Sequence, residues 1–303
     1  MATANVTTTF DSGALHIVID NRPTGFPCAS DILKLCRSSN SVGFPFPSSD
    51  QPTAWIKFGW GVTRGEALTQ HKVALAMNTI PNTAVHVPIV YLAFATDARS
   101  YMTDPCGYIV MEFVPGLTVE QRLRNPDVNA KDMYQAVGRA VQQLIEYRAP
   151  SGTQPGPVGG GIIRHDFFST RESAVAYRTV DILQDHVNRI LKLGGYSQRV
   201  DFADETTDGL PLCLSDIHQS NWIIDDEGRV HAIDFGHVGF LPPSFVAYAI
   251  EQSHFFAKRV AKYVNYARSK KNLYAMEIAA GQLVLYGSSL RGLPRSAKEL
   301  AKA

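Results

Sequence analysis

Cysteine is scarce in the 303-residue sequence, and the few that occur lack the spacing of a cross-link or a metal site. Disulfide frameworks and zinc sites use cysteines in close pairs such as Cys-x-x-Cys. No such pair occurs among the four cysteines, which are Cys28, Cys36, Cys106 and Cys213. The spacing predicts reduced thiols and, with them, a cytoplasmic protein.

The sequence also has no apolar run long enough for a membrane helix, which needs about 20 residues. Its longest run, at 85–95, contains His86 and Pro88 and is interpreted as a buried strand. Residues 1–11 are polar and have neither the basic nor the apolar region of a secretory signal. We therefore expect no membrane partner.

Charge of one sign is not in excess: 29 Lys and Arg stand against 28 Asp and Glu, a formal net charge of +1. Affinity for nucleic acid needs a basic surface, so no nucleic-acid partner is expected. Hydrophobic residues make up 45% and charged residues 19%, as in ordinary globular proteins. A chain of this length can form one large or two modest domains, and the oligomeric state stays open.

In the first third, short apolar runs closed by turn residues predict a sheet with one helix. The helix is expected at 66–78, where Ala67, Val73, Ala74 and Met77 lie near one face. The segment 38–52 is rich in helix and strand breakers and is expected to be a loop. The predicted strands are 16–20, 31–36, 54–59, 89–95 and 108–113.

The chain breaks at Val114-Pro115-Gly116, and the sequence beyond it has mainly helical spacing. This break predicts an N-terminal lobe at 1–113, holding the sheet and one helix. It predicts a mainly helical C-terminal lobe at 114–303. The turn 225–228 predicts a hairpin, and Ser244 is expected to cap a helix. The predicted helices are 131–147, 172–193, 244–266 and 273–286.

Three residues carry the clearest chemical signal: Asp216, Asn221 and Asp234, separated by steps of 5 and 13 residues. Phosphoryl transfer from ATP needs a carboxylate to orient and deprotonate the acceptor hydroxyl, and oxygen ligands for magnesium. The order and the intervening hairpin suit Asp216 as the base and Asn221 and Asp234 as metal ligands. Each residue alone is equally typical of a loop or turn, and the combination favours function.

A phosphotransferase of this kind also needs a strand lysine for the ATP phosphates and a helix glutamate to hold it. Lys57 follows Ile56 in an apolar strand, and Glu66 comes near the start of the next helix. The alternative is structural: Lys57 extends its ammonium to solvent, and Glu66 favours the helix N-terminus. The downstream residues favour the functional interpretation.

With these residues in this order, the sequence resembles the aminoglycoside phosphotransferase and choline kinase family over about 54–245. The family's catalytic loop resembles Leu214–Asn221, and its metal-binding step resembles Ile233-Asp234-Phe235. The resemblance implies a bilobal, α+β, protein-kinase-like fold that binds ATP and Mg²⁺ in a cleft. By the same resemblance, the lobe at 1–113 holds the nucleotide-binding sheet and helix, and the lobe at 114–303 holds the catalytic loop, metal site and substrate pocket. It also implies that adenine bonds to backbone groups around Glu112 and Val114, with Met111 lining the adenine pocket or simply the core.

Two departures from the family pattern stand out. Leu214 stands where the family usually has a histidine that braces the catalytic loop. No Gly-x-Gly-x-x-Gly motif precedes Lys57. A serine-rich flap often replaces that motif in the family, so Ser39, Asn40 and Ser41 are candidate phosphate donors.

The sequence after Gly236 narrows the acceptor. Only five residues, 237–241, separate it from Pro242-Pro243, and no Ala-Pro-Glu follows as in protein kinases. A small molecule with a hydroxyl group is therefore the expected substrate. The alternative is a kinase-fold protein that binds a ligand without transfer, or catalyses another reaction. The acids at 201–208 and the pair His165-Asp166 are interpreted as loop features.

Overall fold

The computed structural model of the protein describes residues 7–10, 13–39, 41–97, 106–252 and 255–294. The chain forms two compact units. One consists of Met1–Gly116 and Ile223–Gly236, and the other of Leu117–Trp222 and His237–Ala303. The first unit thus includes a segment from a distant part of the sequence. The lobe boundary expected after residue 113 stays a prediction.

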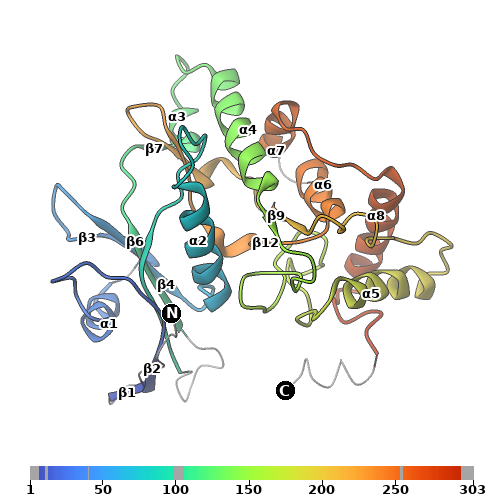
Figure 1. Ribbon diagram of the computed structural model, residues 1–303, viewed down its shortest axis with the longest axis horizontal. Helices are drawn as coiled ribbons and strands as arrows, with labels where there is room; N and C mark the ends of the chain where they lie inside the picture. The colour runs from blue at the N-terminus through green and yellow to red at the C-terminus, as the bar shows by residue number, and fades with distance from the viewer. Residues whose placement is uncertain (1–6, 11–12, 40, 98–105, 253–254, 295–303) are drawn as a thin grey trace. The chain divides into compact units, whose positions relative to one another are not determined.

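An antiparallel sheet forms the centre of the first unit (Figure 1). Its described strands follow the order β1-β2-β5-β6-β4-β3. The predicted strands at 16–20, 54–59, 89–95 and 108–113 are confirmed within this sheet. The bounds are Thr7–Phe10 for β1, Gly13–Asp20 for β2, Gly43–Phe46 for β3, Ala54–Gly59 for β4, Val90–Thr96 for β5 and Cys106–Glu112 for β6.

Alternation along β6 gives this sheet two apolar faces, each packed against one helix (Figure 1). Tyr108 and Val110 cluster with α1 (Ala29–Arg37), whereas Ile109 and Met111 cluster with Ala67 of α2 (Arg64–Met77). Successive side chains of a strand point to opposite faces. Ile56 in β4 belongs to the α1 cluster, so the next residue, Lys57, points to the α2 face.

Residues 31–36, predicted as a strand, lie in helix α1, so that prediction is wrong. The buried residues Ala29, Ile32, Leu33 and Cys36 recur at steps of three and four, which is helical spacing. A short apolar run cannot be told from a helix segment by composition alone. The helical spacing of these buried residues is recognisable only when Ala29 is included.

The predicted loop 38–52 contains strand β3 at the edge of the sheet, which the prediction did not include. Pro45 has no backbone N–H, and a proline is tolerated where one side of a strand has no partner. Gly43 of β3 pairs with Lys57 of β4. The serine-rich segment before Gly43 therefore ends beside Lys57.

Helices make up most of the second unit. Helices α4 (Ala130–Glu146) and α6 (Pro243–Gln252) both contact strand β9 (Leu210–Leu214). This strand is the middle one of a sheet with β8 (Arg148–Ala149) and β12 (Val238–Phe240). Helix α5 (Val180–Leu193) contacts α8 (Lys270–Leu285). Its other elements include β7 (Leu117–Thr118), α3 (Val119–Arg122) and α7 (Phe255–Val260). The hairpin strands β10 (Trp222–Ile224) and β11 (Val230–Ala232) belong, apart from Trp222, to the first unit.

Two predicted helices begin or end elsewhere. Helix α5 begins only at Val180, because Thr179 caps it by accepting from the Ile182 N–H. The residues before it are held by Ser173, whose hydroxyl accepts from the Ile163 N–H and donates to the Val175 carbonyl. The helix predicted at 244–266 consists of α6 and α7, and residues 253–254 lie outside the described ranges. Ser244 lies inside α6 and is not its N-cap.

The helices predicted at 66–78, 131–147 and 273–286 and the hairpin around 225–228 are confirmed. The fold class is α+β, with an antiparallel N-terminal sheet and mainly helices after it, as expected. None of the helices in the described part of the chain combines the length and hydropathy needed to span a lipid bilayer.

Candidate functional site

The candidate site residues of the first unit meet at Lys57. Its Nζ lies 2.6 Å from Oε1 of Glu66, in the first turn of α2. Thr63 caps that helix by accepting from the Glu66 N–H at 3.1 Å, which fixes where α2 begins. The Glu66 side chain is 1% exposed, so its carboxylate is buried against a cation. Burial disfavours the charged lysine, but the two carboxylates that face it outweigh burial and raise the pKa of Lys57.

The second carboxylate at Lys57 is Asp234. Its Oδ1 accepts from Lys57 Nζ at 2.9 Å and from the Gly236 N–H at 3.2 Å. A side chain at Gly236 would bring a Cβ to 3.2 Å from Asp234 Oδ1 and 3.4 Å from Glu66 Oε2. Glycine is therefore the residue that leaves room for both carboxylates. Asp234 itself has a φ of +62°, in the left-handed region that non-glycine residues rarely adopt.

The serine-rich segment lies at the start of β3, next to Lys57 in the strand register. Ser41 donates its hydroxyl to the Gly43 carbonyl at 2.9 Å, and its backbone N–H lies 3.2 Å from the Ser39 hydroxyl. Asn40, the third candidate of this segment, lies outside the described residues. The phosphate-binding role of these three residues stays a prediction.

The connector after β6 carries the residues expected around adenine. Within the described ranges, the backbone N–H of Val114 has no hydrogen-bond acceptor, so it is a donor that a purine could use. Met111 is only 6% exposed and lies in the apolar cluster between the sheet and α2. Its sulfur also accepts from Gln70 Nε2 at 3.3 Å, so Met111 is part of the core.

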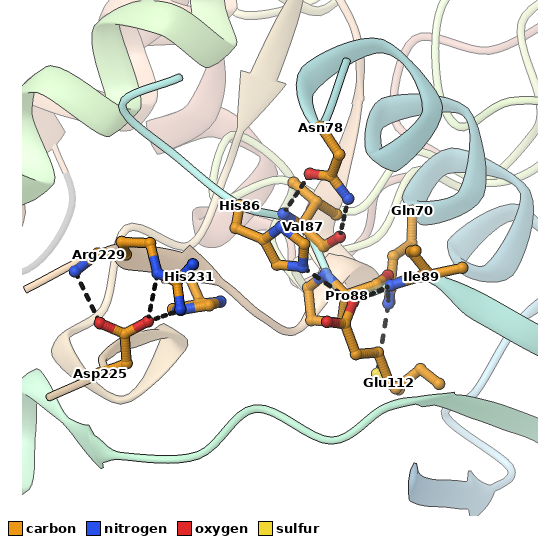
Figure 2. A network of polar contacts seen from close by, with 11 residues as sticks. Gln70, Asn78, His86, Val87, Pro88, Ile89, Glu112, Asp225, Arg229 and His231 are labelled. Carbon is orange, nitrogen blue, oxygen red and sulfur yellow. Dashed lines mark hydrogen bonds and ion pairs between the residues drawn. The ribbon is translucent and has the colours of Figure 1, made fainter. Parts of the chain in front are cut away.

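The Glu112 side chain points away from that connector into a polar network (Figure 2). Its Oε2 lies 2.8 Å from His86 Nε2 and accepts from the Ile89 N–H at 3.1 Å. Burial opposes ionisation, but these two hydrogen bonds prevail and lower the pKa of Glu112. Glu112 can therefore contact adenine only through its backbone.

The same network fixes the hairpin that leads to Asp234. The rings of His86 and His231 are 5.0 Å apart, edge to face, and His231 Nε2 lies 2.9 Å from Asp225 Oδ2 (Figure 2). Arg229 donates to the same carboxylate oxygen at 2.8 Å. Burial at Asp225 is outweighed by its bonds to His231 and Arg229, which hold its pKa well below the usual range. Asp225 is thus a structural carboxylate at the hairpin turn.

In the second unit, Asp216 and Asn221 lie on one tightly held loop. Asn221 donates from Nδ2 to the Asp216 carbonyl at 3.0 Å, and Nδ2 lies 3.4 Å from Asp216 Oδ2. Inside the loop, the Asn221 N–H donates to the His218 carbonyl and the His218 N–H to the Asp216 carbonyl. Both ends of the Asn221 amide have partners within the loop, because Oδ1 accepts from the Ser220 hydroxyl at 3.1 Å. An amide oxygen is also of the type that binds magnesium.

Leu214, the departure from the family pattern, is 7% exposed and ends strand β9. It pairs with Val238 of β12, and the next N–H, from Ser215, donates to the His237 carbonyl at 3.0 Å. The loop is therefore braced by the backbone of His237 and the side chain of Asn221. A histidine side chain at position 214 is not required for the contact between Asn221 and Asp216.

Sequence reasoning missed one neighbour of Asp216. Arg171 donates from Nε to Asp166 Oδ1 at 2.6 Å, and its NH2 nitrogen lies 3.4 Å from Asp216 Oδ1. Burial disfavours the charged guanidinium, but the neighbouring carboxylates of Asp166 and Asp216 outweigh burial and raise the pKa of Arg171. An arginine in an irregular loop belongs to no motif or periodic pattern. The dipeptide His165-Asp166, which the sequence analysis interpreted as a loop feature, supplies the carboxylate that anchors Arg171.

Two other groups with functional potential are structural in the second unit. Glu205, within the acidic run, accepts from Ser244 Oγ at 2.6 Å and from Asn272 Nδ2 at 2.8 Å. His165 is fully buried, and burial lowers its pKa to about 4. Both findings agree with the expectation that these segments are loop features.

The side chains present suit ATP and magnesium. A magnesium ion bound with ATP needs only one or two protein oxygens, because phosphates and water complete its shell. Asp234 offers a carboxylate that is 48% exposed, and Asn221 offers an amide oxygen. Within the described residues, no three His, Cys, Asp or Glu side chains cluster to hold a metal by themselves. Each of the two groups is thus of the type that serves a metal bound together with a nucleotide.

Several solved structures are similar to the chain. An aminoglycoside phosphotransferase APH(4)-Ia, a thermostable mutant bound to AMP-PNP and hygromycin B, is 16% identical, with a TM-score of 0.43 over 91% of this chain and 96% of that one. The gentamicin complex of APH(2")-IIa is 15% identical, with a TM-score of 0.40 over 86% and 87%. Spectinomycin phosphotransferase APH(9)-Ia, with ADP and spectinomycin, is 13% identical, with a TM-score of 0.41 over 91% and 93%.

Curated protein sequences gave no match to the chain. The model of the phosphotransferase enzyme family, APH, matches residues 63–245, which is more than half of the chain. The matched range includes Glu66, Asp216, Asn221 and Asp234, and it begins shortly after Lys57. The chain therefore belongs to the phosphotransferase enzyme family, as its motifs predicted, and is a small-molecule phosphotransferase.

Proposed function

We propose that the protein transfers the γ-phosphoryl group of ATP, in a magnesium-dependent reaction, to the hydroxyl group of a small molecule. The observation that carries this proposal is the double contact of Lys57 with Glu66 and Asp234. These three residues come from a strand, a helix and a distant hairpin, yet both carboxylates contact the lysine. Phosphoryl transfer from ATP requires a lysine, a glutamate and a metal-binding aspartate of this kind. A lysine that served only packing would not need two carboxylates.

In this proposal the first unit binds the nucleotide. Lys57 contacts the α- and β-phosphates while Glu66 holds its ammonium in place. The Val114 N–H and the Glu112 backbone bind adenine, and Ser39, Asn40 and Ser41 donate to the phosphates. Asp234 and Asn221 hold magnesium. The metal, when bound, neutralises charge on the phosphates during transfer.

Asp216 acts on the acceptor. Its carboxylate accepts a hydrogen bond from the acceptor hydroxyl and takes the proton as the oxygen attacks phosphorus. The contact with Asn221 Nδ2 and the ion pair with Arg171 leave the carboxylate little freedom to rotate. A carboxylate held in this way is prepared for one direction of approach.

A small acceptor is favoured by the chain that follows Asp234. Strand β12 begins at Val238 and α6 at Pro243, so no long segment that could hold a polypeptide intervenes. Gentamicin, hygromycin B and spectinomycin are bound in the solved structures named above. Aminoglycosides are accordingly one class in the acceptor panel, next to choline, glycerol and hexoses.

The test is ATP consumption by the purified chain with and without magnesium, across that acceptor panel. We expect magnesium-dependent transfer to at least one hydroxyl compound, identified as a phosphate ester by mass spectrometry. Tight ATP binding without transfer to any compound would favour the alternative of a ligand-binding protein. The absence of both binding and transfer would contradict the proposal.

A further inference from the structure

Arg171 lies between two carboxylates of the second unit, and its distances to them differ. The bond from Nε to Asp166 Oδ1 is short at 2.6 Å, whereas NH2 stays 3.4 Å from Asp216 Oδ1. Asp166 therefore anchors the guanidinium, and Asp216 is the looser partner. On its other side, Asp216 Oδ2 faces Asn221 Nδ2 at 3.4 Å. Both oxygens of the proposed base thus face a donor.

The loop that presents Arg171 is rigidly built. The His165 N–H donates to the Arg171 carbonyl at 2.9 Å, and the Arg171 N–H donates to the Phe168 carbonyl at 2.9 Å. At the base of the loop, His165 Nδ1 accepts from the Phe167 N–H, so Nε2 carries the proton and donates to the Phe245 carbonyl at 3.0 Å. Because His165 is fully buried, the loop is tied to the core of its unit.

The backbone of Arg171 is strained. Its φ of +59° lies in the left-handed region, where glycine or asparagine fits at lower energy than arginine. Within the described residues, Asn82 and Asp234 are the other non-glycine positions with positive φ. Backbone strain is often retained where a particular side chain serves function. An ion pair of an arginine that is 45% exposed adds little stability, so stability does not explain this residue.

We propose that Arg171 is a positioning residue for phosphoryl transfer: anchored on Asp166, it fixes the orientation of the Asp216 carboxylate. This inference rests on the proposed role of Asp216 as the base. Misplacing a reacting group by about 1 Å can lower a rate by about 10²-fold. Without Arg171, Asp216 Oδ1 loses the cation that faces it. The acceptor hydroxyl then meets the carboxylate less often in a reactive geometry.

The experiment compares Arg171→Gly with a matched control, Arg189→Ala. Arg189 is 49% exposed and, like Arg171, is ion-paired to an aspartate, Asp185, which belongs to no proposed site. Kinetics use the best acceptor from a panel of choline, glycerol, glucose and kanamycin. We expect Arg171→Gly to lower kcat about 10- to 100-fold with the KM for ATP unchanged, and Arg189→Ala to change neither. The melting temperature of Arg171→Gly should be no lower than that of the parent, because glycine relieves the strain.

The double variant Arg171→Gly with Asp216→Asn separates positioning from independent action. If Arg171 works through Asp216, its removal adds less than about 3-fold to the loss caused by Asp216→Asn alone. Two losses that multiply would overturn the inference, as would kcat values for Arg171→Gly that match those of Arg189→Ala. Failure of Asp216→Asn itself to lower kcat would instead contradict the proposed function on which the inference rests.

Discussion

Two clusters of one cation and two carboxylates occur in the chain, and they differ in what fixes their geometry. Each places one cation between two carboxylates: Lys57 between Glu66 and Asp234, and Arg171 between Asp166 and Asp216. At Lys57 both contacts are shorter than 3 Å, and one partner, Glu66, is buried. At Arg171 one contact is short and one is long, and the guanidinium is half-exposed.

This difference explains how each cluster maintains its geometry. A buried ion pair cannot lose one member cheaply, so burial itself keeps Lys57 and Glu66 together. An exposed pair contributes only about 0–1 kcal/mol, and the second cluster therefore depends on a rigid loop with a strained backbone. The comparison teaches that the Lys57 cluster is fixed by the core of the first unit, and the Arg171 cluster by the loops of the second.

The largest expected effect is at Asp234. Asp234→Asn should lower kcat by about 10³-fold or raise the magnesium requirement strongly, because a metal ion supplies several kcal/mol and about 1.4 kcal/mol is a factor of ten. The measurement is turnover across a magnesium titration. Asp20→Asn, which removes an exposed ion-paired carboxylate of the same unit, is the control. Magnesium dependence equal to that of the parent would remove Asp234 from the metal site.

Lys57→Ala should weaken productive ATP binding, lowering kcat/KM for ATP by about 10²-fold, since one fixed charge at a phosphate contributes on the order of 3 kcal/mol. The variant also leaves Glu66 buried without its cation, so its fold is checked by circular dichroism. Lys34→Ala, an exposed lysine paired to Asp31, is the control. Unchanged ATP kinetics in a folded Lys57→Ala would contradict the nucleotide role of the first cluster.

These residues illustrate which features the sequence reveals. A lysine inside an apolar strand is conspicuous because it needs a partner, and the helix glutamate that follows is the obvious one. Asp216, Asn221 and Asp234 are found by their spacing, since the loop and hairpin between them are local. Arg171 cannot be identified by residue type or by spacing, because its contact with Asp216 depends on how the loop 163–173 packs on the core of the unit.

The same reasoning applies to the fold. Strands with regular alternation were predicted at nearly their observed bounds, whereas 31–36 was misassigned because its apolar residues suit a helix and a strand alike. The segment 172–179 was assigned to a helix from one apolar stripe. Its structure depends on side-chain hydrogen bonds of Ser173 and Thr179, which no periodic pattern encodes.

Gly236→Ala tests how tightly the first cluster is packed. The added Cβ would lie 3.2 Å from Asp234 Oδ1, so the carboxylate must shift by a few tenths of an ångström. We expect kcat to fall about 10-fold, since a displaced metal ligand lowers the fraction of reactive complexes. Gly281→Ala on α8, where a Cβ meets nothing within 4 Å, should leave turnover unchanged. Equal turnover of both variants would mean that the cluster tolerates displacement.

The smallest effect concerns the loop that holds the second cluster. Since the pKa of His165 is lowered to about 4 by burial, the folded state disfavours its proton. The stabilisation is present in full above the unfolded pKa of 6.5 and is lost as pH falls from there through the folded pKa. Between pH 7 and pH 5 this amounts to about 2 kcal/mol.

Urea unfolding at these two pH values measures that loss. His165→Gln should lack it, so its free energy of unfolding should fall about 2 kcal/mol less than that of the parent between pH 7 and pH 5. Identical pH dependence of the parent and His165→Gln would show that His165 is not held neutral.

The central claim is that Asp216 is the base in phosphoryl transfer and takes no part in binding the nucleotide. Asp216→Asn tests this claim most directly, through ATP affinity measured by calorimetry and kcat measured on the same preparation, with Asp185→Asn as the control. We predict unchanged ATP affinity and a kcat lowered by about 10²-fold or more, the scale of a lost general base. A kcat equal to that of Asp185→Asn would contradict the assignment of phosphoryl transfer to this site.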